Sequence, residues 1–159
     1  MSGLARSAVA EALATFLFVF IIIAAVNNVG DLTPLVIGFA LMTLVFATGH
    51  LSGAHLNPAV SLGIFLRGAL SVGTSKDHLN NSFYGLAIGT TVFIGAATVG
   101  GISGGGFNPA VAFGLAISGQ FAWANLWLYV LAPLVGAAIG AIAFRMLNRH
   151  DLTKATGDN

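Results

Sequence analysis

The sequence predicts an all-α membrane protein built as an inverted repeat, with four full transmembrane spans and two re-entrant half-helices. Three observations lead to this prediction. The chain of 159 residues is 57% hydrophobic and only 7% charged, and its mean hydropathy is +0.92. A phrase that contains Asn-Pro-Ala-Val occurs twice, each time before a short apolar run. All six lysines and arginines fall on one side of the resulting topology.

Composition excludes several functional classes. A soluble domain with so few charges would be poorly soluble, whereas a membrane protein needs no such charges. A net charge of +1 argues against nucleic acid or another polyanion as a partner. The chain has no cysteine, which excludes disulfides, thiolate metal sites and cysteine nucleophiles. The sequence shows no catalytic triad set, zinc-protease motif, Walker loop or carboxylate pair. We therefore expect neither an enzyme nor a cofactor.

Four apolar stretches have the length of a membrane span, and they cover residues 8–26, 32–48, 83–102 and 123–147. Each is close to the ~20 residues that a helix needs to cross a ~30 Å hydrocarbon core. The first stretch has no clear cleavage-site pattern and is followed by further apolar spans. It is therefore interpreted as a transmembrane helix and not as a signal peptide.

The repeated phrase predicts the two half-helices. SGAHLNPAVSLGIFL starts at Ser52, and SGGGFNPAVAFGLAI starts at Ser103. Asn is a preferred N-cap and Pro a preferred first helical residue, so helices should begin at Pro58 and Pro109. The apolar runs 58–66 and 109–117 would each be about 14 Å long, close to half of a bilayer.

Charge predicts the orientation. The basic residues are Arg6, Arg67, Lys76, Arg145, Arg149 and Lys154, whereas the opposite loops, 27–33 and 103–122, carry only Asp31. By the positive-inside rule, both termini and the loop around Lys76 are cytoplasmic. We expect one transmembrane domain at 1–150, with a first repeat at 1–70, a polar linker at 71–82 and a second repeat at 83–150. Residues 151–159 form a polar tail.

In this topology the two half-helices enter from opposite faces, and such repeats place functional sites near the midplane. Their facing N-termini bring two positive dipole ends together. Asn57 and Asn108 would project amide N–H donors into the gap, which opposes a proton-conducting chain of waters and repels cations. The alternative is that both are only helix caps.

Two pairs of glycines have the spacing of helix contacts. Gly85/Gly89 and Gly136/Gly140 are small-xxx-small pairs, which let membrane helices approach closely. The alternative is that glycine is simply common in membrane helices.

These motifs resemble the paired boxes of the aquaporin, or major intrinsic protein, family. The likeness covers nearly the whole chain, including AEALATFLFVF from Ala10, GHLSGAHLNPAV from Gly49 and FYGLAIG from Phe83. It implies a passive channel for water and small uncharged solutes such as glycerol or urea, in a plasma or inner cell membrane. Protons and ions would be excluded at the two boxes, Asn57, Pro58, Ala59 and Asn108, Pro109, Ala110. The alternative is a structural membrane protein that keeps the fold and does not conduct.

The resemblance also implies a selectivity constriction on the outer side, formed by Ile37, Ala96, Gly105 and Val111. An arginine usually follows the second box in the family, but Val111 stands there. Such a ring is wide and apolar and favours small neutral solutes beside water. Tyr129 sits where water-selective members often have an aromatic residue, whereas Ala112 replaces the aspartate typical of glycerol channels.

Glu11 and His55 are the ionisable residues expected near the pore. Glu11 is the only acidic residue within a span, and burial there is costly unless it has partners. The resemblance implies that Glu11 supports the re-entrant loop through backbone hydrogen bonds; the alternative is a position at the cytoplasmic interface. His55 would line the cytoplasmic pore mouth, unless it is a solvated loop residue like its neighbour His50.

The family has six full spans, and two of them have no counterpart in this sequence. The stretch at 68–82 includes ALSVGTSKDHLNNS, which is too short and polar to span. Because two spans are absent together, the orientation of the remaining ones is preserved. Members of the family form homotetramers, and we expect copies of this chain to associate and cover the opening.

Overall fold

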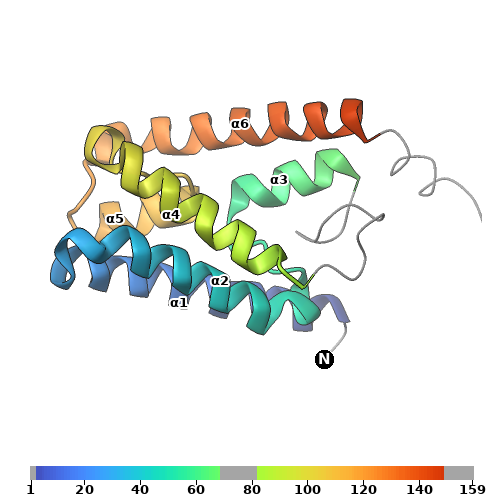
Figure 1. Ribbon diagram of the computed structural model, residues 1–159, viewed down its shortest axis with the longest axis horizontal. Coiled ribbons are helices and arrows are strands. Elements are labelled where there is room, and N and C mark those ends of the chain that lie inside the picture. Colours follow the sequence, from blue (N-terminus) through green and yellow to red (C-terminus); the bar gives the residue numbers. More distant parts are fainter. Residues whose placement is uncertain (1–2, 69–81, 149–159) are drawn as a thin grey trace, which may run out of the picture.

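Helices make up nearly all of the computed structural model, which describes residues 3–68 and 82–148 (Figure 1). The long helices are α1 (Gly3–Asn28), α2 (Thr33–Ser52), α4 (Tyr84–Ser103) and α6 (Leu126–Leu147). The short ones are α3 (Pro58–Arg67) and α5 (Pro109–Ile117), and the 3-10 turns η1 (Gly30–Leu32) and η3 (Trp123–Asn125) lead into α2 and α6. The predicted linker, apart from Ser82, and the predicted tail lie outside the described residues, as do Lys76, Arg149 and Lys154.

The prediction of four full spans is confirmed. The four long helices are long and apolar enough to cross a membrane. The longest, α1, has 26 residues and α4 has 20. They are therefore about 39 and 30 Å long, which is enough to cross a ~30 Å hydrocarbon core. Their outward surfaces carry large apolar side chains such as Phe16, Phe20 and Trp127. The chain is therefore an all-α, multi-pass membrane protein.

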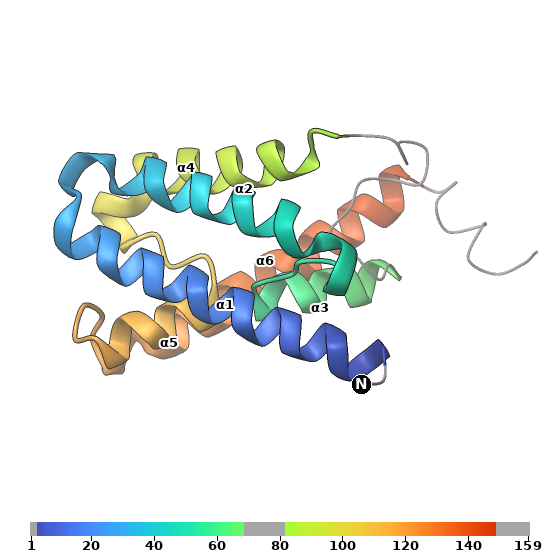
Figure 2. The same cartoon turned by 90° about the horizontal axis from the view of Figure 1, so that it is seen from below.

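The two half-helices begin near the middle of the molecule and run in opposite directions (Figure 2). They have 10 and 9 residues, so each is about 14–15 Å long and covers half of a bilayer. Their bounds agree with the prediction from the repeated phrase. This opposed pair gives the fold its inverted-repeat character.

Glycines bring α2 and α4 into direct backbone contact. A Cβ on Gly89 would lie 2.5 Å from the Gly38 carbonyl oxygen and 2.7 Å from the Met42 Cβ. A Cβ on Gly85 would lie 2.7 Å from the ring of Phe46. A larger residue at Gly89 would meet the backbone of α2, and one at Gly85 would displace the Phe46 ring. The predicted close approach at Gly85/Gly89 is therefore confirmed.

The same prediction is wrong for Gly136/Gly140 within the described part of the chain. A Cβ on either residue would meet no atom within 4 Å, and both residues are exposed on α6. Instead α6 packs on α3 through its other side, where the Arg67 guanidinium lies 4.0 Å from the centre of the Phe144 ring. Arg145 Nη1 also donates to the Leu66 carbonyl at 3.0 Å.

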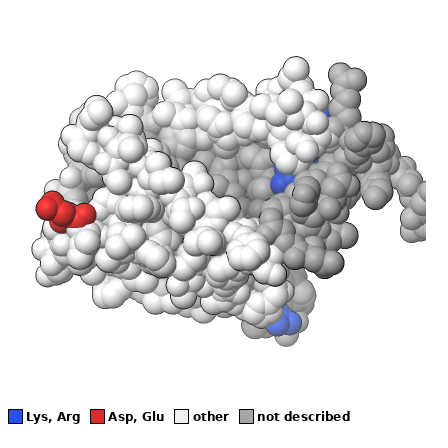
Figure 3. Space-filling view, viewed as in Figure 1, with Lys and Arg blue, Asp and Glu red and all other residues white. Residues whose placement is uncertain are grey.

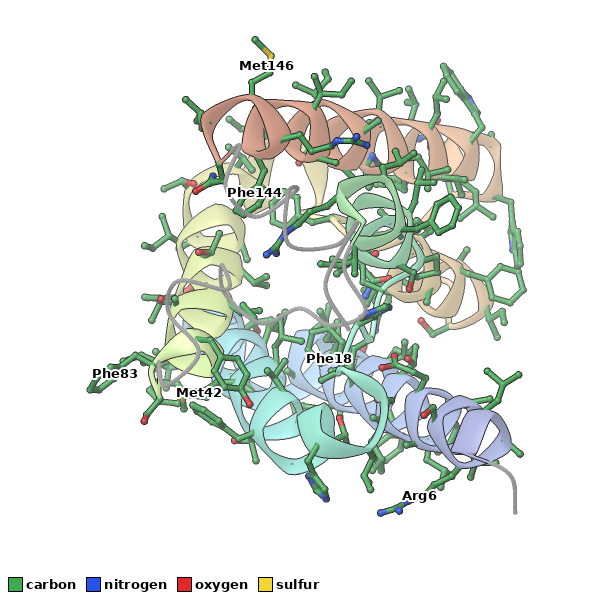
Figure 4. All side chains as sticks on the ribbon, turned by 90° about the vertical axis from the view of Figure 1, so that its right-hand side faces the viewer. Arg6, Phe18, Met42, Phe83, Phe144 and Met146 are labelled. Atoms are coloured by element: carbon green, nitrogen blue, oxygen red, sulfur yellow. The ribbon has the colours of Figure 1, made fainter. Side chains whose placement is uncertain are left out.

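The core lies between α1, α2, the first loop and α5, and its buried members include Phe18, Ile22, Leu41, Val45, Leu56, Val111 and Leu115. Seen along the molecule, Phe18 points toward the centre, whereas Arg6 and Met146 lie at the periphery (Figure 4). The core is therefore concentrated on the α1–α2 side, and α6 contributes little to it.

The charged residues mark the two ends of the molecule. On the face shown in Figure 3 the basic atoms lie toward one end and the acidic atoms at the opposite end. Asp31 is in η1, between α1 and α2, whereas Arg6, Arg67 and Arg145 belong to the other ends of α1, α3 and α6. These are called the Asp31 end and the arginine end below.

The contact between α2 and α4 yields a stability prediction. Gly89→Ala should lower the free energy of unfolding by about 1–3 kcal/mol, because its methyl group would be driven into the Gly38 carbonyl. The matched control is Gly140→Ala, where the space is open and helix propensity alone should raise stability by up to about 1 kcal/mol. Thermal unfolding in detergent compares the two. Equal stability of both variants would contradict the close contact.

Candidate functional site

The two Asn-Pro-Ala boxes form the starts of α3 and α5. Asn57 Oδ1 accepts a hydrogen bond from the Ala59 N–H at 2.9 Å, and Asn108 Oδ1 accepts one from the Ala110 N–H at 3.0 Å. Pro58 and Pro109 occupy the first turn of each helix, where a missing N–H costs nothing. Each asparagine is therefore the N-cap of its half-helix, with its amide oxygen turned inward to the helix.

The amide nitrogens of the same asparagines join the two loops. Asn57 Nδ2 donates to the Phe107 carbonyl at 3.2 Å, and Asn108 Nδ2 donates to the Leu56 carbonyl at 2.7 Å. A side-chain amide has two N–H groups. One group of each asparagine is thus used to hold the two loops together. The helix caps were among the alternatives predicted from the sequence, but these cross-links were not.

Glu11 holds the first loop. Its Oε1 accepts from the Ser52 hydroxyl at 2.6 Å and from the His55 N–H at 2.8 Å. Its Oε2 accepts from the Leu56 N–H at 2.8 Å. Bonds to an ionised group are the stronger class of hydrogen bond, and here three of them converge on one carboxylate.

The first loop needs such support because its backbone is strained. Ala54 and Leu56 have φ values of 53° and 52°, in the left-handed region that residues with a side chain avoid. Such conformations cost about 1–2 kcal/mol each. Both side chains are nonetheless almost fully buried, at 1% and 0% exposure. The strained loop turns the Leu56 carbonyl toward Asn108.

A cavity of about 580 Å³ extends from the Asp31 end to the two asparagines. Asp31, Thr33 and Gln120 line it, as do Asn57 and Asn108. The four residues assigned to the constriction, Ile37, Ala96, Gly105 and Val111, all line this cavity as well. They come from α2, α4, the second loop and α5, so the fold brings together residues that are far apart in the sequence.

His55 lines the same cavity near the asparagines. Its Nδ1 lies 3.0 Å from the Ser61 hydroxyl, and its Nε2 is buried without a partner in the part of the chain that the structure describes. The Ser61 hydroxyl also donates to the Asn57 carbonyl at 3.2 Å. His50, in contrast, is exposed in the last turn of α2. Ser61 was not predicted as a site residue; its place one helical turn after Asn57 is the signal that could have found it.

Gln120 is a second residue that sequence reasoning missed. It follows α5, lines the cavity, and places Nε2 3.4 Å from the Ile23 carbonyl. Its Oε1 is buried without a partner among the described residues. Outside the repeated phrase, only its polarity within a largely apolar segment could have drawn attention to it.

Tyr129 and Ala112, the two residues compared with subtype markers of the family, do not line the first cavity. Tyr129 is absent from the lining of the first cavity; its hydroxyl donates to the Ser103 carbonyl at 2.7 Å, and its ring lies 4.4 Å from that of Phe121. Ala112 is fully buried in α5. Neither side chain lines the cavity beside Val111.

A second cavity, of about 720 Å³, lies on the other side of the asparagines. It is lined by the start of α3, the second loop, the end of α4 and the first half of α6. Figure 3 shows the molecular surface hollowed on the face where α4 and α6 diverge. Asn57, Val60 and Phe107 line both cavities. At these residues a single layer separates the first cavity from the second, which is also called the lateral cavity below.

Comparison with known proteins places this arrangement in a family. The profile of the family described as "Major intrinsic protein" matches residues 1–77 and 70–144. The two matches meet in the polar stretch where the two spans were predicted to be absent.

Three relatives illustrate the range of similarity. Aquaporin NIP1-1 of Zea mays is 27% identical over 75% of this chain, and the match covers 65% of that protein. Aquaporin NIP1-4 of Oryza sativa subsp. japonica is 27% identical over 94% of this chain and 77% of its own length. Glycerol uptake facilitator protein-like 6 of Lactiplantibacillus plantarum is 42% identical over 55% of this chain and 41% of its own.

The chain thus spans less than two thirds of the length of the maize and Lactiplantibacillus relatives. Its alignment with the rice protein extends over 217 positions, against 159 residues in this chain, so at least 58 positions have no residue here. That number suffices for two spans of ~20 residues with their loops. With the profile matching most of its length, the chain belongs to the major intrinsic protein family.

Proposed function

We propose that the chain is a passive transmembrane channel for water and small uncharged solutes of the glycerol or urea type. The observation that carries this proposal is the first cavity, which leads from the Asp31 end to the capped N-termini of two opposed half-helices. Its wall is largely apolar, with a few polar groups at the mouth and at the asparagines. Such a passage binds a polar molecule weakly enough to release it. The proposal includes no cofactor and no coupling to an energy source.

Exclusion of protons and ions is proposed to occur where the two half-helices meet. Both N-termini point toward this place, and each adds a positive dipole end. The remaining N–H of Asn57 and of Asn108 would donate to the oxygen of a passing water. That water would then direct its own hydrogens away from the centre, which interrupts a proton-conducting chain.

The ring of Ile37, Ala96, Gly105 and Val111 is proposed to set selectivity. Its four residues share the first cavity, and Val111 is 5% exposed, as expected for a side chain packed in the wall. None of the four carries a charge or a side-chain donor. A solute larger than water would lose no specific contact there, so glycerol-sized molecules should pass.

The orientation follows from the same charges as before. The arginine end would face the cytoplasm of a plasma or inner cell membrane, with both termini on that side. Association of copies, as in a tetramer, stays a prediction; the exposed side of α6 around Gly136 and Gly140 is open for it.

A non-conducting membrane protein is the second candidate function, and one observation favours it. The lateral cavity leaves the pore wall one side chain thick at Asn57, Val60 and Phe107. Lipid chains that entered this cavity could press on the asparagines and close the passage.

Water flux distinguishes the two candidates. Stopped-flow measurement on proteoliposomes should show faster osmotic shrinkage than empty vesicles, with a low activation barrier. Val111→Trp should bring the rate back close to that of empty vesicles, because the indole would fill the cavity at its wall. Ile139→Trp is the matched control, since Ile139 is 62% exposed on α6. Flux equal to that of empty vesicles for the unchanged protein would establish the non-conducting alternative.

The constriction is tested by the ratio of solute to water flux. Val111→Arg should lower glycerol and urea uptake by about tenfold or more while water flux changes less, since a fixed donor narrows the ring and favours the smallest solute. Val111→Leu is the control for side-chain size without charge. An unchanged solute-to-water ratio in the arginine variant would contradict the assignment.

A further inference from the structure

The two loops before the half-helices share most of their hydrogen bonds. The Gly53 N–H donates to the Gly49 carbonyl at 3.0 Å, and its counterpart Gly104 donates to the Gly100 carbonyl at 2.8 Å. The next residues, Ala54 and Gly105, both donate to the hydroxyl of the preceding serine, at 3.2 and 3.3 Å. Both asparagines cap their helices and cross-link to the other loop in the same way. The repeat is therefore a repeat of geometry as well as of sequence.

The hydrogen bonds of the two loops differ at the carboxylate of Glu11. In the first loop three donors converge on it, the Ser52 hydroxyl and the N–H groups of His55 and Leu56. Ungapped superposition of the two phrases makes Ser103, Gly106 and Phe107 their counterparts.

None of these three counterparts bonds to a carboxylate among the described residues. Two of them bond to backbone carbonyls, and one has no hydrogen-bond partner there. The Ser103 hydroxyl donates at 3.2 Å to the carbonyl of Val99, in the preceding turn of its own helix, α4. The Phe107 N–H bonds at 2.9 Å to the Gly105 carbonyl in a three-residue turn. Gly106 is buried, and within the described residues its N–H has no partner. An unpaired buried N–H costs about 1–3 kcal/mol, so this loop is left in a state that an acceptor would relieve.

All three counterpart residues line the second cavity. The rest of its wall is mainly apolar and comes from α3 and α6, including Val60, Ala132 and Ala137. The corresponding position beside the first loop is filled by α1, which brings Glu11 with it. The second loop thus has the donors and the space, but none of the described helices occupies the equivalent position.

We propose that the second cavity is the docking site for a transmembrane helix of another polypeptide that carries an acidic side chain. Its carboxylate would accept hydrogen bonds from the Ser103 hydroxyl and the N–H groups of Gly106 and Phe107. The apolar side chains around the acid would pack between α4 and α6. An acidic residue within a span is costly in lipid, so it has a strong reason to seek these donors.

A second copy of this chain is the less suitable occupant. Its five acidic residues are Glu11, Asp31, Asp77, Asp151 and Asp158, and only Glu11 lies within a span. Glu11 already binds three donors of its own first loop. A copy would have to break these bonds in order to provide a carboxylate, so the internal repeat points to a partner of different sequence.

The probe for this site is a synthetic peptide of residues 3–28, the α1 segment with its glutamate, added to the full chain in detergent micelles. The comparison peptide has Glu11→Leu. Binding is measured by energy transfer between labels on the peptide and on the chain. The amide proton of Gly106 is followed by nuclear magnetic resonance in a sample with ¹⁵N-glycine. Neither readout needs the chain to conduct water. The docking site can therefore be disproved while the proposed channel stands, and the channel can be disproved while the docking site stands.

The glutamate peptide should bind about tenfold or more tightly than the leucine peptide, because hydrogen bonds to a charged acceptor are worth about 1.5–3 kcal/mol. The Gly106 amide proton should shift downfield on binding, while that of Gly53, held by Gly49, stays in place. Ser103→Ala should weaken binding severalfold. Ser118→Ala should not, although its hydroxyl also bonds a helix carbonyl, because Ser118 does not line the cavity.

Equal binding of the two peptides, without a shift at Gly106, would overturn the proposal and leave a merely apolar groove. Native mass measurement that finds two copies of the chain, together with exclusion of the peptide, would also overturn it in favour of self-association.

Discussion

The hydrogen bonds of one carboxylate, that of Glu11, determine how the first loop can run. The loop passes through the interior of a membrane protein, where each backbone polar group that is left unsatisfied is costly. Glu11 accepts from Ser52, His55 and Leu56, and thereby stabilises left-handed conformations at Ala54 and Leu56. The same conformations turn the Leu56 carbonyl to Asn108 and bring Asn57 to Phe107. The meeting of the two half-helices therefore depends on a residue that lies in neither of them.

The second loop also contains residues with positive φ, but there they are glycines. Gly104 and Gly105 adopt positive φ at no side-chain cost, where the first loop has Gly53 and the strained Ala54. Among the described residues no carboxylate takes the position equivalent to Glu11, and the Phe107 N–H bonds to the Gly105 carbonyl in its own loop. The lateral cavity lies beside this loop, between the start of α3, the end of α4 and the first half of α6.

The helices and their starting residues depend on local sequence, and they could be predicted. Continuous apolar runs predict the four spans, and Asn-Pro at both boxes predicts where α3 and α5 begin, because capping and proline chemistry act over a few residues. The four residues of the constriction share one cavity, although their role stays a prediction. Features that depend on packing could not be predicted. Gly85/Gly89 and Gly136/Gly140 look alike in sequence, but among the described helices only the first pair faces a neighbour. Likewise, nothing in the residue types reveals that the Leu56 and Phe107 carbonyls would receive the asparagine amides, since a backbone carbonyl has no sequence signature.

The most direct test of the role of Glu11 is amide hydrogen exchange at His55 and Leu56 in a Glu11→Leu variant. We predict that both amides exchange at least about tenfold faster than in the unchanged protein, since each loses its bond to the Glu11 carboxylate. The Gly53 amide is the internal reference, because its partner is the Gly49 carbonyl and not Glu11. Unchanged exchange at His55 and Leu56 would show that this carboxylate does not hold the first loop.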